Sequence, residues 1–214
     1  MKKLFGKNLN AGSTAPVVPP SPIVVVSGLP RSGTSMMMKM LAAGGVPPLT
    51  DELRVADRDN PEGYFEFERV KGLDKGDVSW LPEAQGKSVK IISALLKYLP
   101  AEYSYQVVFV RRHMSEILAS QRKMLVHRGE NPNKMDDVQM ATVFEKHLQQ
   151  IDLWLRRQPN IELLYVHYSD IMSDSMQEIA RLQRFLGCDL DEQRMFETVD
   201  PVLYRNRRDV AAAA

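Results

Sequence analysis

The sequence has a single cysteine and no long apolar run, and both absences narrow the kind of protein it encodes. Cys188 has no second cysteine with which to form a disulfide within the chain, so we expect a reducing, cytoplasmic environment. No run of about 20 apolar residues occurs, which is the length needed to cross a membrane. The two lysines near the N-terminus are not followed by the apolar stretch that a signal peptide requires. We therefore expect no membrane span and no export.

The chain also has almost no net charge. Its 28 basic and 27 acidic side chains nearly cancel, which excludes the broad positive field typical of proteins that bind nucleic acids or anionic membranes. The four histidines are scattered, and neither they nor the carboxylates have the spacing of metal ligands. Any anion site must therefore be local, and we predict no metal site.

The composition indicates a single folded unit. The 214 residues, 44% of them apolar, are enough for one well-packed domain. Residues 1–21 are rich in proline, glycine and serine and are expected to form a flexible N-terminal segment. The domain is expected to span residues 22–210, followed by a tail of alanines at 211–214.

Alternating strand and helix patterns predict the fold class. Short β-branched runs indicate buried parallel strands, and segments without helix breakers indicate the helices that follow them. The expected strands are Ile23 to Ser27, Gln106 to Val110 and Leu163 to Val166, with Val89 to Ser93 as a further candidate. The expected helices are Thr34 to Ala43, Ser115 to Val126, Met135 to Arg157 and Asp174 to Leu186. This order predicts a single-domain α/β fold with a mainly parallel sheet and helices on both faces.

A loop framed by two glycines lies between the first expected strand and the first expected helix. It reads Gly28-Leu-Pro-Arg-Ser-Gly33-Thr34-Ser35 and has the frame of a P-loop, in which backbone N–H groups at a helix N-terminus hold phosphate oxygens. Thr34 replaces the lysine that an ATP-hydrolysing P-loop carries, while Arg31 puts a cation inside the loop. This departure argues against ATP hydrolysis and indicates a different phosphate ester.

A second motif follows the strand expected at Gln106 to Val110. Arg112 comes directly after this strand, and Ser120 lies two helical turns further on. In an open α/β sheet, ligands bind outside the carboxyl ends of the strands, so Arg112 is expected on the same rim as residues 30–35. One nucleotide can then contact both motifs.

Together these motifs resemble those of the sulfotransferase superfamily, including the protein-tyrosine sulfotransferases. Residues 30–35 resemble the family's 5′-phosphosulfate loop, and Arg112 with Ser120 resembles its 3′-phosphate motif at the family's own spacing. Tyr168 belongs to a Tyr-x-Asp element like the one after the family's later strand, which implies a place near the adenine. The resemblance covers about residues 23–186 and implies the P-loop NTPase-like sulfotransferase fold.

The resemblance also implies the cofactor and its contacts. The donor would be 3′-phosphoadenosine-5′-phosphosulfate (PAPS) and the product adenosine 3′,5′-bisphosphate (PAP), with no metal. Two arginines of the basic C-terminal segment resemble a shortened form of the loop that closes on the 3′-phosphate, although simple solvated charge is an equal alternative. The expected nucleotide-binding residues are Pro30, Arg31, Ser32, Gly33, Thr34, Ser35, Arg112, Ser120, Tyr168, Arg205 and Arg207.

Sulfuryl transfer also needs a base and cations near the reacting group. Many cytosolic family members use a histidine after a Lys-Thr pair, but the matching stretch from Val89 contains none. Glu52 is predicted as the base, because the protein-tyrosine sulfotransferases carry a similar motif at the same distance from the loop arginine. Arg31 and Lys90 are the expected catalytic cations, although Lys90 could equally be a lysine at a strand edge. The alternative bases are Glu62, Glu66 and Glu68.

Two other functions and the identity of the acceptor remain open from the sequence. A P-loop nucleotide kinase would have a similar order of motifs, but the missing Walker lysine speaks against it. A module that binds adenosine bisphosphate without turnover would keep the fold and lack a usable base. The acceptor hydroxyl or amine cannot be assigned to a phenol, sugar, peptide or amine, and the oligomeric state is not indicated. Tyr64, Phe65, Phe67 and Trp80 form either an acceptor wall or, as such residues more often do, part of the core.

Overall fold

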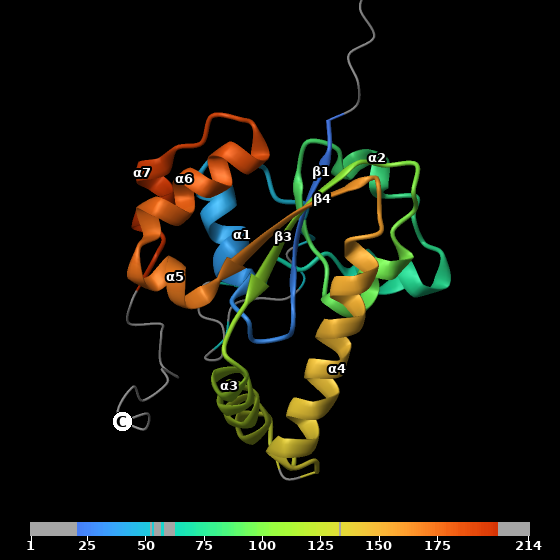
Figure 1. Cartoon of the computed structure of the whole chain (residues 1–214), viewed down its shortest axis with the longest axis vertical. Coiled ribbons are helices and arrows are strands. Elements are labelled where there is room, and N and C mark those ends of the chain that lie inside the picture. The colour runs from blue at the N-terminus through green and yellow to red at the C-terminus, as the bar shows by residue number, and fades with distance from the viewer. Residues whose placement is uncertain (1–20, 52, 54–56, 58–62, 133, 201–214) are drawn as a thin grey trace, which may run out of the picture.

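The computed structural model describes residues 21–51, 53, 57, 63–132 and 134–200. At its centre lies a four-stranded parallel sheet with the strand order β2-β1-β3-β4 (Figure 1). The strands are β1 (Ile23–Gly28), β2 (Ser88–Lys90), β3 (Tyr105–Arg111) and β4 (Ile161–His167). Because all four run in the same direction, their carboxyl ends lie at one edge of the sheet.

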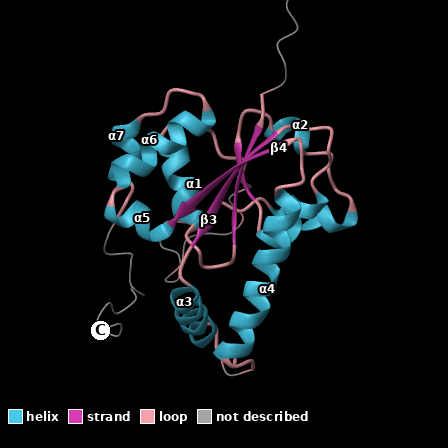
Figure 2. Cartoon of the chain, viewed as in Figure 1, coloured by secondary structure: helices cyan, strands magenta, loops and turns pink. Residues whose placement is uncertain are grey.

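Helices cover both faces of this sheet (Figures 1 and 2). One face, called here the α1 face, packs against α1 (Thr34–Ala43), α5 (Tyr168–Ser173), α6 (Ser175–Leu186) and α7 (Glu192–Glu197). The opposite face, called the α4 face, packs against the 3₁₀ helices η1 (Glu68–Lys75) and η2 (Ser93–Tyr98) and the α-helices α2 (Leu81–Ala84) and α4 (Asp137–Leu155). Helix α3 (Met114–His127) extends beyond the carboxyl edge of the sheet (Figure 1).

The sequence of β1 is a nearly continuous apolar run because both faces of this strand are buried. All six of its residues are buried, because β2 and β3 flank it and helices cover both of its faces. Successive side chains alternate between the two cores, so that Val25 packs on the α4 face and Val24 and Val26 pack on the α1 face.

The structure confirms the fold class, with two corrections in detail. The strand candidate from Val89 to Ser93 is too long at its end, because β2 stops at Lys90 and η2 begins at Ser93. The reason is that the last residue of β1 that pairs with β2 is Val26. The short helix α5 was not expected; it turns the chain directly after β4.

The expected N-terminal segment and alanine tail lie almost wholly outside the described residues, so those domain boundaries stay predictions. Among the helices of the described part of the chain, none combines the length and the apolar character needed to cross a membrane.

Candidate functional site

The loop between β1 and α1 has a backbone that only particular residues permit. Gly28 has φ 152°, and a Cβ built there would lie 2.6 Å from the carbonyl oxygen of Val110. Gly33 has φ 105°, and a Cβ there would lie 2.4 Å from Cδ2 of Tyr168. Arg31 adopts φ 70°, which is unusual for a residue with a side chain. The glycine frame is therefore required by close packing as well as by the turn.

Helix α1 begins directly after this loop. Gly33 is its N-cap residue, and no described side chain caps the helix. No acidic residue lies in the first turn, which starts with Thr34 and Ser35. The first N–H groups and the positive end of the helix dipole therefore favour an anion at this point. Pro30 is exposed at the tip of the loop, while Ser32 is buried inside it.

The two sequence motifs meet at this loop. Nε of Arg31 donates a hydrogen bond to Oγ of Ser120 at 2.9 Å, across 89 positions of sequence. Nη1 of Arg112 donates to the carbonyl oxygen of Arg31 at 3.3 Å. The Arg112 guanidinium also lies 4.4 Å from the centre of the Tyr168 ring. The structure thus brings Arg31, Arg112, Ser120 and Tyr168 together at the carboxyl edge of the sheet.

Glu116 is a partner of Arg112 that the sequence analysis missed. Nε of Arg112 donates to Oε2 of Glu116 at 2.8 Å, and the two side chains are only 8% and 3% exposed. A buried guanidinium needs such compensation, and the carboxylate holds it in one orientation. The sequence contains a pattern that could have predicted this ion pair, because Arg112 and Glu116 lie four positions apart around the start of the expected helix.

Lys90 lies beside the loop on the α1 face. Its ammonium donates to the backbone carbonyl of Tyr64 and to Oγ of Ser35, the latter at 3.4 Å. Oε1 of Glu66 lies 3.7 Å from Nζ, and the lysine side chain is only 9% exposed. Lys90 ends the edge strand β2, but its side chain is largely buried and lies at the N-terminus of α1, beside Ser35.

The candidate bases differ in their surroundings and in whether the structure describes them. Glu66 lies next to Lys90, whereas Glu68 forms a surface ion pair with Lys71 at 2.8 Å, with 55% of its side chain exposed. Glu52 and Glu62 lie outside the described residues, as do both arginines expected to close over the nucleotide, Arg205 and Arg207. The aromatic segment contributes to the core, since Trp80 is 1% exposed and Phe67 packs edge-on against it at 5.6 Å.

Comparison with known protein families identifies the domain. The family model described as the sulfotransferase domain matches residues 21–213. The chain belongs to the sulfotransferase family. No curated protein matches this sequence.

Solved structures share the fold of this sulfotransferase domain. The sulfotransferase domain of the olefin synthase of Synechococcus PCC 7002 is 19% identical, with 90% of each chain covered and a TM-score of 0.56. The sulfotransferase STF1 of Mycobacterium tuberculosis H37Rv is 15% identical, with 86% of this chain and 73% of that chain covered and a TM-score of 0.52. At these identities the likeness supports the shared fold alone.

A second polar cluster of the sulfotransferase domain lies on the α4 face. Asp152 of α4 accepts hydrogen bonds from Arg156 at 2.9 Å, from Arg111 at 3.3 Å and from the hydroxyl of Tyr165. The hydrogen bonds from Arg156 and Tyr165 hold the pKa of Asp152 below its ordinary value. The Arg111 guanidinium lies 4.3 Å from the centre of the Tyr165 ring. This cluster ties α4 to β3 and β4.

One of the four histidines has a defined hydrogen-bond partner. His147 of α4 lies 2.8 Å from Oγ of Ser93, measured from Nε2, and so links α4 to η2. Burial, and secondarily the nearby Lys97, lowers the pKa of His147 below its ordinary value of 6.5. Within the described ranges, no group of three or more histidine, cysteine, aspartate and glutamate side chains is arranged to hold a metal ion.

Proposed function

We propose that this sulfotransferase domain moves a sulfuryl group from PAPS to an acceptor hydroxyl or amine by in-line displacement. The observation that carries the proposal is the contact between the two motifs, in which Arg31 binds Ser120 and Arg112 binds the carbonyl of Arg31. A nucleotide with phosphates at both its 5′ and 3′ positions needs two anion sites a ribose apart. The P-loop and the Arg112 region supply two neighbouring anion sites of that kind.

The residues suit the two phosphates for different reasons. Backbone N–H groups of residues 30–35 and the uncapped start of α1 suit the 5′-phosphosulfate. Arg112 and Ser120 suit the 3′-phosphate, since a planar guanidinium binds phosphate through two parallel hydrogen bonds. Tyr168 is proposed to contact the adenine, and Arg205 and Arg207 to close over the 3′-phosphate.

The proposed displacement involves no metal ion. The acceptor oxygen or nitrogen attacks sulfur, the bond from sulfur to the bridging phosphate oxygen breaks, and adenosine 3′,5′-bisphosphate leaves with the electron pair. Arg31 and Lys90 would stabilise the negative charge that develops on the phosphate and the sulfuryl oxygens. The acceptor proton would pass to a carboxylate base, for which we propose Glu52, with Glu66 beside Lys90 as the alternative.

A thermal-shift experiment without added metal tests the binding half of the proposal. Adenosine 3′,5′-bisphosphate should raise the melting temperature, because binding at a concentration of 100 Kd stabilises a folded protein by about 2.7 kcal/mol. AMP, which lacks the 3′-phosphate, should give a smaller shift, and ATP with Mg²⁺ should not exceed the bisphosphate. The absence of any shift at millimolar bisphosphate would contradict the proposed function.

The catalytic half is tested by following the release of labelled sulfate or sulfated product from labelled PAPS. Turnover is expected with a suitable acceptor, and slow hydrolysis of the donor without one. Bisphosphate binding with neither activity would identify a non-catalytic nucleotide-binding module. We also infer a cytoplasmic location, because the single cysteine precludes a disulfide within the chain.

A further inference from the structure

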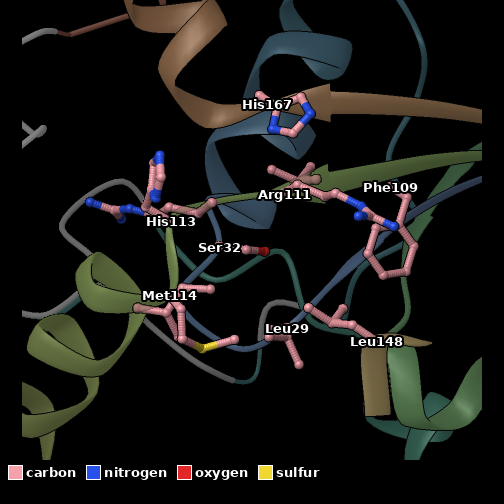
Figure 3. Close-up of a pocket in the computed structure, with 11 residues that line it drawn as sticks. Leu29, Ser32, Phe109, Arg111, His113, Met114, Leu148 and His167 are labelled. Carbon is pink, nitrogen blue, oxygen red and sulfur yellow. The ribbon is translucent and has the colours of Figure 1, made fainter. Parts of the chain in front are cut away.

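A cavity of about 250 Å³ lies beneath the P-loop, between the carboxyl end of β3, the start of α3 and the middle of α4 (Figure 3). It touches the loop through Leu29 and Ser32, and α4 through Leu148. Ser32 and Arg112 of the proposed nucleotide site also line it, whereas its other lining residues have no proposed nucleotide role.

Three buried polar atoms of residues that line this cavity make no hydrogen bond within the described part of the chain. They are Oγ of Ser32, which is 1% exposed, Nε of Arg111, and Nη2 of Arg112, whose guanidinium is otherwise held by Glu116 and by the carbonyl of Arg31. The inference rests on Ser32 and Arg111, which belong to different elements, the loop after β1 and the strand β3. Buried polar groups are normally satisfied, so a pair of them at one cavity indicates a polar ligand group that binds there.

The charge around the cavity favours an anionic group. Its lining contains the guanidinium groups of Arg111 and Arg112 and no carboxylate from the described part of the chain. Glu116 compensates Arg112, but Asp152, which contacts Arg111, also pairs with Arg156, so one carboxylate faces two guanidinium groups. No described side chain caps the N-terminus of α3, although Glu116 in its first turn offsets part of the helix dipole.

The rest of the cavity is apolar. Leu29, Phe109, Met114, Ile117 and Leu148 form its walls. The volume of about 250 Å³ is far more than the roughly 10–15 Å³ that one ordered water needs. Walls of this kind also do not supply the several polar partners that a cluster of waters requires. An apolar body joined to an anionic group fits the lining better than water does.

We propose that this cavity binds the sulfuryl acceptor and selects one that carries an anionic group on an apolar body. Arg111, Ser32 and the start of α3 recognise the anion, and Leu29, Phe109 and Leu148 contact the apolar part. That the ligand is a sulfuryl acceptor rests on the proposed sulfotransferase function. The binding preference itself is independent of that function, since it concerns only the cavity.

Three phenols that differ only at one end provide the probe. They are 4-hydroxyphenylacetate, which is anionic, 4-ethylphenol, which is neutral, and tyramine, which is cationic. Calorimetric titration into the full chain, with and without adenosine 3′,5′-bisphosphate, should show 4-hydroxyphenylacetate binding about tenfold or more tighter than the other two. A hydrogen bond to a charged group is worth enough to produce that ratio.

The chain offers a matched pair of variants. Arg111→Met should abolish the preference for the anionic phenol, because it removes the guanidinium at the cavity. Arg156→Met removes the other guanidinium on Asp152. Arg156 is 64% exposed and does not line the cavity, so the preference should be reduced at most in part, because Asp152 then pairs with Arg111 alone, and it should not be abolished as in Arg111→Met. Leu148→Trp should weaken all three phenols by filling the apolar part. If Arg111→Met does not fold, Ser32→Ala replaces it and should weaken the anionic phenol selectively by several fold.

Three results would overturn the inference. These are equal affinity for the three phenols, survival of the preference in Arg111→Met, and competition between bisphosphate and 4-hydroxyphenylacetate for one site. The last result would assign the cavity to the nucleotide. If bisphosphate fails to bind while the anionic preference and its dependence on Arg111 hold, the proposed sulfuryl transfer fails, and the cavity remains a site for an anionic amphiphile.

Discussion

Arg111 and Arg112 are neighbours in the sequence and both line the cavity, yet their guanidinium groups have different partners. Side chains alternate along a strand, so Arg111, at the end of β3, follows Phe109 onto the α4 face. Arg112 instead lies against Arg31, Glu116 and Tyr168. Two adjacent identical residues therefore serve two different environments.

The two environments differ in how firmly each guanidinium is held. Arg112 is 8% exposed and has its own buried carboxylate partner, Glu116, while the loop arginine beside it binds a serine hydroxyl. Arg111 is 34% exposed and shares its carboxylate partner, Asp152, with Arg156. The first arrangement fixes the guanidinium in one orientation, and the second leaves Arg111 more accessible to a ligand at the cavity.

The largest effect is expected where the proposed chemistry occurs, beside Lys90 on the α1 face. Glu52→Gln should lower turnover by about 10²–10⁴-fold with donor affinity nearly unchanged, because the amide keeps the size of the side chain and cannot accept the proton. Glu66→Gln is the paired variant, since Glu66 lies next to Lys90. Steady-state kinetics together with bisphosphate titration separates chemistry from binding.

Two outcomes of that pair would change the assignment of the base. A full loss in Glu66→Gln with normal turnover in Glu52→Gln would move the base to Glu66. A fall in melting temperature with near-normal turnover would assign Glu52 a structural role. Glu68→Gln is the control, because Glu68 forms an exposed pair with Lys71 and should change neither quantity.

The next effect sharpens the contrast between the adjacent arginines. Arg112→Ala should weaken adenosine 3′,5′-bisphosphate by roughly 10- to 100-fold and AMP much less, because the lost contacts belong to the 3′-phosphate. Arg111→Ala should not discriminate between the two nucleotides. Isothermal titration of both ligands into both variants checks this. Equal weakening of bisphosphate and AMP in Arg112→Ala would assign Arg112 another role.

The smallest effect concerns the link between Ser93 and His147 on the α4 face. The pKa of His147 is lowered in the folded chain, so the unfolded chain binds more protons as the pH falls below about 6.5. The free energy of unfolding should therefore decrease between pH 7 and pH 5, down through the lowered folded pKa. Urea unfolding at several pH values measures this decrease.

His147→Gln provides the comparison for that pH dependence. It should be less sensitive to pH over the same range, because it has no imidazole to protonate. Ser93→Ala should cost about 1 kcal/mol at neutral pH, the usual worth of one hydrogen bond. An identical pH profile for the wild-type chain and His147→Gln would contradict the assignment.

Local patterns in the sequence were sufficient for the order of the main strands and long helices and for the loop, but not for the short helices such as α2, α5 and α7. The β-branched run and the glycine frame predicted β1, the turn and α1, and α1 has the predicted bounds of Thr34–Ala43. Buried strands and long helices carry strong periodic signals, whereas the end of β2 depended on where its neighbour stops pairing. The nucleotide-site roles of the matched residues stay predictions, although the structure brings Arg31, Arg112 and Ser120 together.

The sequence by itself determined the fold class and the family, because each depends on patterns of residues close together in the chain. Only the tertiary structure decided that Glu66 lies beside Lys90, that Asp152 pairs with Arg111, and that Arg111 borders a cavity. The first two contacts join residues 24 and 41 positions apart, through side chains whose directions are fixed by packing. No short-range sequence pattern predicts such contacts, because they depend on how the elements pack against the sheet.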